Sequence, residues 1–187
     1  MNISAVLLTG GESRRMRQDK ATLLFRGKLL WQIQLDLLRT LEPVDVLVSA
    51  RTDPPWRPLD VKFVSDESPS RGPLSGLTAA LTRIRTGHLL VLAIDMPFMS
   101  ERYLRAICDQ IDSGHGVLPT IGDRAEPLAA IYPVSAHVDF VAALSGTEFS
   151  LQSVTKKLVA SGKLRLLPVA KEEEELFRNL NDAADLD

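Results

Sequence analysis

Short apolar runs alternate with stretches of helical period in the first half of this chain, and this alternation constrains its fold more than any other feature. Residues 3–9 (ISAVLLT), 44–50 (VDVLVSA), 61–65 (VKFVS) and 88–94 (HLLVLAI) have the length and apolar character of buried strands. The last of these is the most apolar, which predicts a central strand. The runs therefore predict a sheet whose strands are largely buried.

The stretches between these runs have the spacing of helices. Residues 29–41 (LLWQIQLDLLRTL) place apolar side chains three and four positions apart, on one helical face. Pro73 suits the first turn of a helix that extends to residue 84, and Ser100 suits the N-cap of a helix in SERYLRAICDQI. Strands that alternate with helices predict an α/β fold with three layers, a Rossmann-like, mostly parallel sheet covered by helices on both faces.

The pattern is less regular after residue 114. GVLPT, PLAAIYP and KLRLLPV predict strands, while residues 134–144 and 151–161 predict helices. The tail predicts a last helical turn or two. Because the alternation is weaker here, we expect a mixed edge to the sheet.

The composition excludes several classes of function. A formal net charge of -2 gives no general attraction to nucleic acid or to an anionic membrane, so any anion site must be local. Cys108 is the only cysteine, which excludes an internal disulfide and a thiolate-rich metal site. No apolar run approaches the roughly 20 residues that span a bilayer, and no segment resembles a targeting signal. We therefore expect a cytoplasmic protein.

A basic loop follows the first predicted strand. In LLTGGESRRMRQDK, Gly10 and Gly11 allow a ligand to approach the backbone, and their N–H groups can donate to an anion. Arg14, Arg15 and Lys20 follow and could neutralise phosphate oxygens. The spacing matches neither the P-loop nor the dinucleotide fingerprint. Ligands of open parallel sheets bind beyond the carboxyl ends of the strands, where this loop is expected to lie.

Two carboxylates follow other predicted strands and should reach the same edge. Asp95 comes directly after the most apolar strand, where a carboxylate needs a partner, and a Mg²⁺ ion that bridges to phosphate is a natural one. Asp66 could bind a nucleotide hydroxyl or base, or begin a turn. Gly72 and Gly76 flank the start of the helix at Pro73, whose free N–H groups can face a base or a phosphate.

Five motifs, in this order, resemble those of the molybdenum cofactor guanylyltransferases, which are MobA-like nucleotidyltransferases. They are LTGGESRRMRQDKA (8–21), GPLSG (72–76), DMP (95–97), RAEPL (124–128) and NLNDAADL (179–186). The resemblance covers nearly the whole chain. It implies a nucleotidyltransferase fold in a single domain, residues 1–187, with a nucleotide-binding half of about 1–100 and an acceptor-substrate half of about 101–187.

The resemblance also implies roles for individual residues. The nucleotide ligands would be Leu8, Thr9, Gly10, Gly11, Lys20, Ser49, Asp66, Gly72, Pro73 and Asp95. The catalytic residues would be Arg15, Lys20 and Asp95, with Asp95 also the ligand of a Mg²⁺ cofactor. The residues on the acceptor side would be Arg124, Glu126, Asn179 and Asn181.

The implied reaction is Mg²⁺-dependent transfer of GMP from GTP to the terminal phosphate of molybdenum-molybdopterin, with pyrophosphate as the other product. The implied partners are proteins that deliver the cofactor and chaperones of molybdoenzymes. The attacking phosphate is already an anion, so no general base is needed. His88, His115 and His137 are accordingly interpreted as structural or solvated residues.

Three alternatives stay open at this point. A cytidylyltransferase shares the implied fold and chemistry, but the double glycine after Thr9 favours guanine, because the cytidine relatives usually have A-A-G there. The second alternative is a sugar-1-phosphate or phospholactate nucleotidyltransferase. The third is a non-catalytic nucleotide-binding subunit, against which Asp95 argues. Arg17 is the one feature that favours such a non-catalytic subunit, because it stands where the family motif has glycine. If that position requires a positive φ, an arginine there would cost on the order of 1 kcal/mol or more.

Overall fold

The computed structural model describes residues 2–10, 19–66, 70–112, 114–147 and 149–180. The strands are β1 (Ile3–Leu8), β2 (Leu24–Phe25), β3 (Lys28–Leu29), β4 (Asp45–Ala50), β5 (Lys62–Ser65), β6 (His88–Ala93), β7 (Gly116–Ile121), β8 (Arg124–Ala125), β9 (Ala129–Pro133) and β10 (Leu164–Pro168). The α-helices are α1 (Leu30–Thr40), α2 (Pro73–Arg83), α3 (Glu101–Cys108), α4 (His137–Leu144) and α5 (Leu151–Ala160). Short 3₁₀ helices are η1 (Lys20–Thr22), η2 (Val134–Ala136) and η3 (Lys171–Phe177).

The central sheet has the strand order β10-β7-β9-β6-β1-β4-β5, with β8 beside β7. The pairs β6–β1, β1–β4, β4–β5 and β10–β7 are parallel, whereas β9 is antiparallel to both β6 and β7. The predicted mostly parallel sheet with a mixed edge is therefore confirmed. β6 lies inside the sheet, as its apolar sequence predicts. Since β9 reverses direction between them, β6 and β7 run the same way and their carboxyl ends share one edge.

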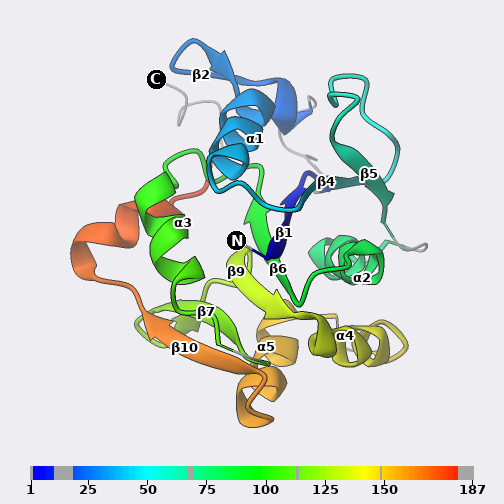
Figure 1. Ribbon diagram of the computed structural model, residues 1–187, viewed down its shortest axis with the longest axis vertical. Helices are drawn as coiled ribbons and strands as arrows, with labels where there is room; N and C mark the ends of the chain where they lie inside the picture. Colours follow the sequence, from blue (N-terminus) through cyan, green and yellow to red (C-terminus); the bar gives the residue numbers. More distant parts are fainter. Residues whose placement is uncertain (1, 11–18, 67–69, 113, 148, 181–187) are drawn as a thin grey trace.

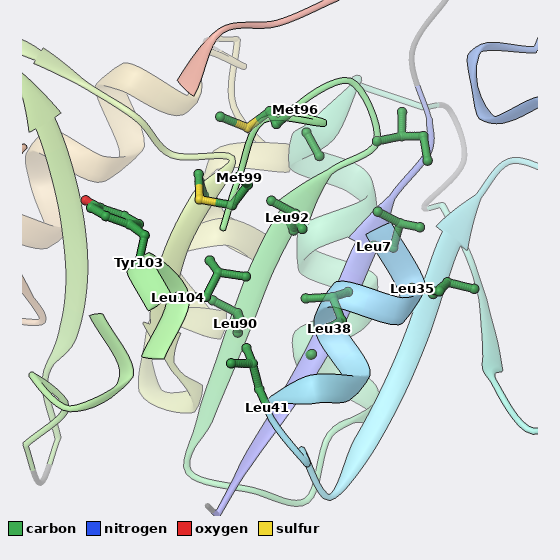
Figure 2. Packing of buried hydrophobic residues seen from close by; sticks show 14 of the residues in the cluster. Leu7, Leu35, Leu38, Leu41, Leu90, Leu92, Met96, Met99, Tyr103 and Leu104 are labelled. Carbon is green, nitrogen blue, oxygen red and sulfur yellow. The ribbon is translucent and has the colours of Figure 1, made fainter. Parts of the chain in front are cut away.

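Helices cover both faces of this sheet, which confirms the three-layer prediction (Figure 1). On one face, leucines of α1 and α3 pack against β1 and β6 (Figure 2). The labelled residues of this cluster are Leu7, Leu35, Leu38, Leu41, Leu90, Leu92, Met96, Met99, Tyr103 and Leu104. On the other face, α2, α4 and α5 pack over a second cluster that contains Leu77, Phe140 and Leu158. Burial of each large apolar side chain contributes about 1.5–3 kcal/mol, so both faces stabilise the sheet.

The helix boundaries follow the local signals in the sequence. Pro73 opens α2, and the Ser100 hydroxyl accepts a hydrogen bond of 3.2 Å from the Tyr103 N–H, as expected of an N-cap. The helix predicted over residues 134–144 is divided into η2 and α4. The small β2–β3 hairpin was not predicted. Its turn residues, Arg26 and Gly27, both have positive φ, an unusual conformation for arginine.

α2 approaches the ends of β4 and β5 closely at Gly76. A Cβ atom added there would lie 2.4 Å from the Ser49 Oγ and 3.0 Å from the Asp66 Oδ1. Neither distance leaves room for a methyl group without a shift of the helix or of these side chains. The GPLSG segment therefore fixes how near α2 can come to Asp66.

We predict that Gly76→Ala lowers the free energy of unfolding by about 1–2 kcal/mol, because overpacking costs about 1–3 kcal/mol and the gain in helix propensity offsets part of it. Urea denaturation followed by tryptophan fluorescence measures the change. Gly87→Ala is the matched control, since a Cβ there meets no atom within 4 Å. A Gly76→Ala variant as stable as the Gly87→Ala variant would contradict the close approach.

Candidate active site

Backbone hydrogen bonds continue past the ends of the parallel strands and bring the predicted site residues to one edge. The Thr9 N–H and hydroxyl both donate to the Ser49 carbonyl, at 3.0 and 2.9 Å. The Ile94 N–H donates to the Leu8 carbonyl at 3.0 Å, and the Asp66 N–H donates to the Ala50 carbonyl at 3.0 Å. The residues that follow β1, β4, β5 and β6 are therefore held beside one another, as the parallel topology predicts.

Lys20 connects the ends of three distant segments. Its Nζ lies 3.1 Å from the Asp95 Oδ2 and donates to the Leu180 carbonyl at 2.8 Å. The Leu180 N–H in turn donates to the Asp95 carbonyl at 2.8 Å. The side chains of Lys20 and Asp95 are 20% and 23% exposed, so the pair is partly shielded from water and still reachable by a ligand. An ammonium group has one more N–H to offer after these two contacts.

The residue before Lys20 is held by aromatic side chains. The Asp19 Oδ1 accepts from the Ala21 N–H at 3.0 Å and caps η1, and its Oδ2 accepts from the Trp56 Nε1 at 3.0 Å. Trp56 stacks on Trp31 of α1, with ring centroids 5.5 Å apart. The loop between β4 and β5 thus positions Lys20 through Asp19. This role of Trp56 was not predicted, because a contact between residues 37 positions apart leaves no local pattern.

Asp66 lies in a close-fitting polar recess. The Ser49 Oγ donates to the Asp66 Oδ1 at 2.6 Å, and Ser49 is only 1% exposed. The Asp66 Oδ2 lies 2.7 Å from where a Cβ on Gly10 would stand, so Gly10 must lack a side chain to approach it. Burial raises the pKa of the Asp66 carboxyl, and the Ser49 hydrogen bond and the nearby Arg51 charge oppose that rise.

The start of α2 faces the same edge. Gly72 has φ +67°, in the left-handed region that favours glycine, and it precedes Pro73 at the helix N-terminus. The Arg71 N–H donates to the Ser75 Oγ at 2.8 Å. The helix predicted to begin at Pro73 does begin there, and Gly76 in its second turn lies close to Asp66.

The predicted acceptor residues lie on neighbouring segments. Arg124 Nε is 3.7 Å from Glu126 Oε1, and burial raises the pKa of the Glu126 carboxyl while Arg124 lowers it. Two residues on, the Leu128 carbonyl accepts from the Ala93 N–H at 2.9 Å, which places this segment beside the end of β6. Asn179 precedes Leu180, and its buried Oδ1 has no hydrogen-bond partner among the described residues. A buried orphan acceptor calls for a partner.

Several predicted residues lie outside the described part of the chain. They are Gly11, Arg14, Arg15, Arg17 and Asn181. Two histidines have structural partners: the His88 Nε2 lies 3.0 Å from the His115 carbonyl, and the His137 Nε2 lies 2.9 Å from the Thr82 Oγ1. None of the described helices combines the length and the apolarity needed to cross a membrane.

We predict a specific pH dependence for the stability of an Asp66→Asn variant relative to the wild type. The folded-state pKa of Asp66 is raised above its ordinary value of 3.8, so the folded protein holds this proton more tightly than the unfolded chain. The wild type therefore loses stability relative to the neutral variant as the pH rises from below 3.8 through the raised pKa. Urea denaturation of both proteins between pH 3.5 and 7, taken as roughly the range in which carboxyls titrate, measures this difference. A relative gain in wild-type stability over that range would contradict the burial of Asp66.

Comparison with known proteins identifies the family of this chain. The model of the MobA-like NTP transferase domain matches residues 5–162. A probable molybdenum cofactor guanylyltransferase of Opitutus terrae is 34% identical, over 99% of this chain and 93% of that protein. One of Natranaerobius thermophilus is 31% identical, over 83% of this chain and 78% of that protein.

Solved structures show the same fold. Molybdopterin-guanine dinucleotide biosynthesis protein A from Archaeoglobus fulgidus superposes with a TM-score of 0.76 at 24% identity, covering 98% of this chain and 94% of that one. A 2-C-methyl-D-erythritol 4-phosphate cytidylyltransferase from Thermus thermophilus gives 0.69 at 17% identity, covering 97% and 94%. The fold is thus shared by a protein of molybdopterin-guanine dinucleotide biosynthesis and by a cytidylyltransferase. The match of the domain model to most of the chain, together with a relative 34% identical over nearly its full length, shows that this protein belongs to the MobA-like NTP transferase family.

Proposed function

We propose that this protein transfers GMP from GTP to the terminal phosphate of molybdenum-molybdopterin, which gives molybdopterin guanine dinucleotide and pyrophosphate. The observation that carries the proposal is the Lys20–Asp95 pair, held at the strand edge beside the recess of Asp66. Two relatives of this chain are probable molybdenum cofactor guanylyltransferases, which supports the choice of nucleotide and acceptor.

In this proposal the nucleoside lies against the backbone of residues 8–10 and the start of α2 at residues 72–73. An ionised Asp66 only accepts hydrogen bonds, so it suits the hydroxyl or N–H donors of a nucleoside. Ser49 was expected to be a nucleotide ligand, but it is almost completely buried and its hydroxyl is directed to Asp66. We therefore assign it the role of orienting that carboxylate. Because Gly10 has no side chain, the nucleoside can approach the backbone beside Asp66.

The triphosphate is assigned to Lys20 and to the loop that precedes it. Lys20 keeps one N–H for a phosphate oxygen while Asp95 and the Leu180 carbonyl fix its position. Arg15 and the backbone N–H of Gly11 would complete the cradle. Fixed positive charge at this place stabilises the charge that builds on the leaving pyrophosphate and reduces repulsion between two polyanions.

The residues at the edge also fit a Mg²⁺ ion. The Asp95 Oδ2 contacts Lys20, and Asn179 would contribute a buried oxygen that has no hydrogen-bond partner within the part of the chain that the structure describes. Within the described ranges, no group of three or more His, Cys, Asp or Glu side chains is arranged to hold a metal ion, so substrate phosphates would supply much of the coordination. This is the usual manner in which proteins hold Mg²⁺ with nucleotides. When bound, the ion would neutralise phosphate charge.

The acceptor phosphate is proposed to approach from the side of Arg124 and Glu126, in the half of the chain after about residue 100. A phosphate monoester is an anion and can attack the α-phosphorus in line without a general base, so positioning and charge are what the protein must provide. Asn179 and Asn181 would lie near this acceptor. The activity would occur in the cytoplasm and would require proteins that deliver the cofactor, followed by chaperones of molybdoenzymes.

The competing hypotheses have less support. The structural likeness to a cytidylyltransferase is at 17% identity and concerns the fold alone. A sugar-phosphate or phospholactate transferase finds no counterpart in the names of the two curated relatives described above. A non-catalytic binding subunit would have no need of a partly exposed carboxylate paired to a lysine at the phosphate edge.

We predict that Asp95→Asn reduces Mg²⁺-dependent formation of the dinucleotide product at least about 100-fold, the scale seen when one electrostatic group of an active site is removed. Chromatography of the product together with a pyrophosphate-release assay measures turnover. The variant should keep the fold, as circular dichroism can check. Asp36→Asn is the matched control, because it breaks a lysine–aspartate pair on the outer surface of α1 and should keep full turnover. Unchanged pyrophosphate release by Asp95→Asn would contradict the assignment of Asp95 as a Mg²⁺ ligand.

A further inference from the structure

A pocket of about 460 Å³ is lined by residues of α5, β7 and β10. These three elements lie together at one end of the molecule (Figure 1). Its volume falls within the roughly 300–1,000 Å³ typical of small-molecule sites. Apolar residues of the sheet and of α5 line it, together with neutral hydrogen-bonding side chains and one charge of each sign. The residues used below are Leu118, Thr120, Asp123, Lys156, Val159 and Leu166.

The pocket extends to the same sheet edge as the active site. β7 runs in the direction of β6, so Thr120 and the β7–β8 turn lie at the edge that carries Asp95. β7 is two strands away from β6 in the sheet, a separation of about 10 Å. Ala125 lines the pocket, and Leu128, three residues later, is hydrogen-bonded to the last residue of β6. The pocket, on the face covered by α5, and the Lys20–Asp95 pair, whose neighbours in the chain belong to the cluster on the opposite face, therefore reach the same edge of the sheet.

A second contact joins the pocket to the predicted nucleotide side. The Arg71 guanidinium lies 4.2 Å from the centre of the Phe149 ring. Arg71 directly precedes Gly72 at the start of α2, and Phe149 lies two residues before α5. The N-termini of α2 and α5 thus adjoin at this edge, with the nucleotide side on α2 and the pocket on α5.

The lining of the pocket favours a neutral heterocycle over a phosphate. Leu118 and Val159 form apolar walls, and Leu166 is 53% exposed, so a flat ligand could cover a large apolar side chain. Asp123 and Lys156 form no ion pair with any described residue and can receive polar ligand atoms. A phosphate needs clustered cations, whereas here one lysine is opposed by one aspartate.

We propose that this pocket binds the pterin ring of the acceptor, while the acceptor's terminal phosphate reaches the Lys20–Asp95 pair. The inference rests on the proposed function. It gives a binding site to the pterin ring, for which the residues at the strand edge provide none. The pterin edge would find hydrogen-bonding groups at Thr120, Asp123 and Lys156, with its faces against the apolar walls.

The test uses 6-hydroxymethylpterin as the probe, followed by its own fluorescence during titration with the full chain. We expect saturable binding to the wild type. Leu166→Asp should weaken it at least about five-fold, because a charge replaces part of the apolar wall, and Lys156→Ala should weaken it to a smaller extent. Lys157→Ala is the matched control, since the neighbouring lysine is exposed but does not line the pocket. GTP affinity, measured by calorimetry, should be the same in all four proteins.

Turnover provides the second readout. The KM for molybdopterin should rise in Leu166→Asp and Lys156→Ala, with the KM for GTP unchanged. Absence of probe binding to the wild type, or equal binding by all variants, would overturn the pocket assignment, and intact GTP binding would then leave the proposed function standing. If circular dichroism shows that Leu166→Asp does not fold, the test is the comparison of Lys156→Ala with Lys157→Ala. Both lysines are exposed on α5, so neither substitution should disturb the fold. If the wild type binds the probe but shows no turnover of GTP, the proposed function is wrong and the pocket assignment stands.

Discussion

The contact between Lys20 and Asp95 is the interaction on which the rest of the site depends. One ammonium group joins the segment after β1, the end of β6 and the chain near residue 180. Both side chains are partly withdrawn from water, so loss of either would leave the other charge poorly compensated. The pair therefore holds the sheet edge together and also keeps a cation and a carboxylate oxygen partly exposed there, where we propose that the triphosphate binds.

The recess of Asp66 illustrates a second constraint, which is space. Gly10 and Gly76 approach this carboxylate from two sides, and at each of them a Cβ would collide with Asp66 or with Ser49. The resulting burial raises the pKa of Asp66, because removal from water disfavours the ionised carboxylate in the ligand-free protein. Such perturbed groups cluster where ligands bind, because ligand donors can then replace the missing water. Packing around one side chain thereby explains one glycine in each of the two motifs, Gly10 and Gly76.

Much of the fold was predictable because its signals are local. The buried strands β1 and β6 are unbroken apolar runs, and Ser100 and Pro73 mark helix starts through their own backbone chemistry. Parallel topology then brings Asp66 and Asp95 to one edge. The β2–β3 hairpin was missed because its turn begins with Arg26, which has no local preference for positive φ. β8 was missed because a two-residue strand carries no period.

The candidate site was predictable as a set of residues and less so as a set of contacts. The support of Lys20 by Asp19 and Trp56, and of Asp66 by Ser49, joins residues far apart in the chain, and no spacing rule links them. The central claim is that this edge binds guanine nucleotide for transfer. Calorimetric titration of the protein with GTP and with CTP, each with Mg²⁺, tests it most directly. We expect GTP to bind more tightly than CTP. Tighter binding of CTP would contradict guanylyl transfer and favour cytidylyl transfer.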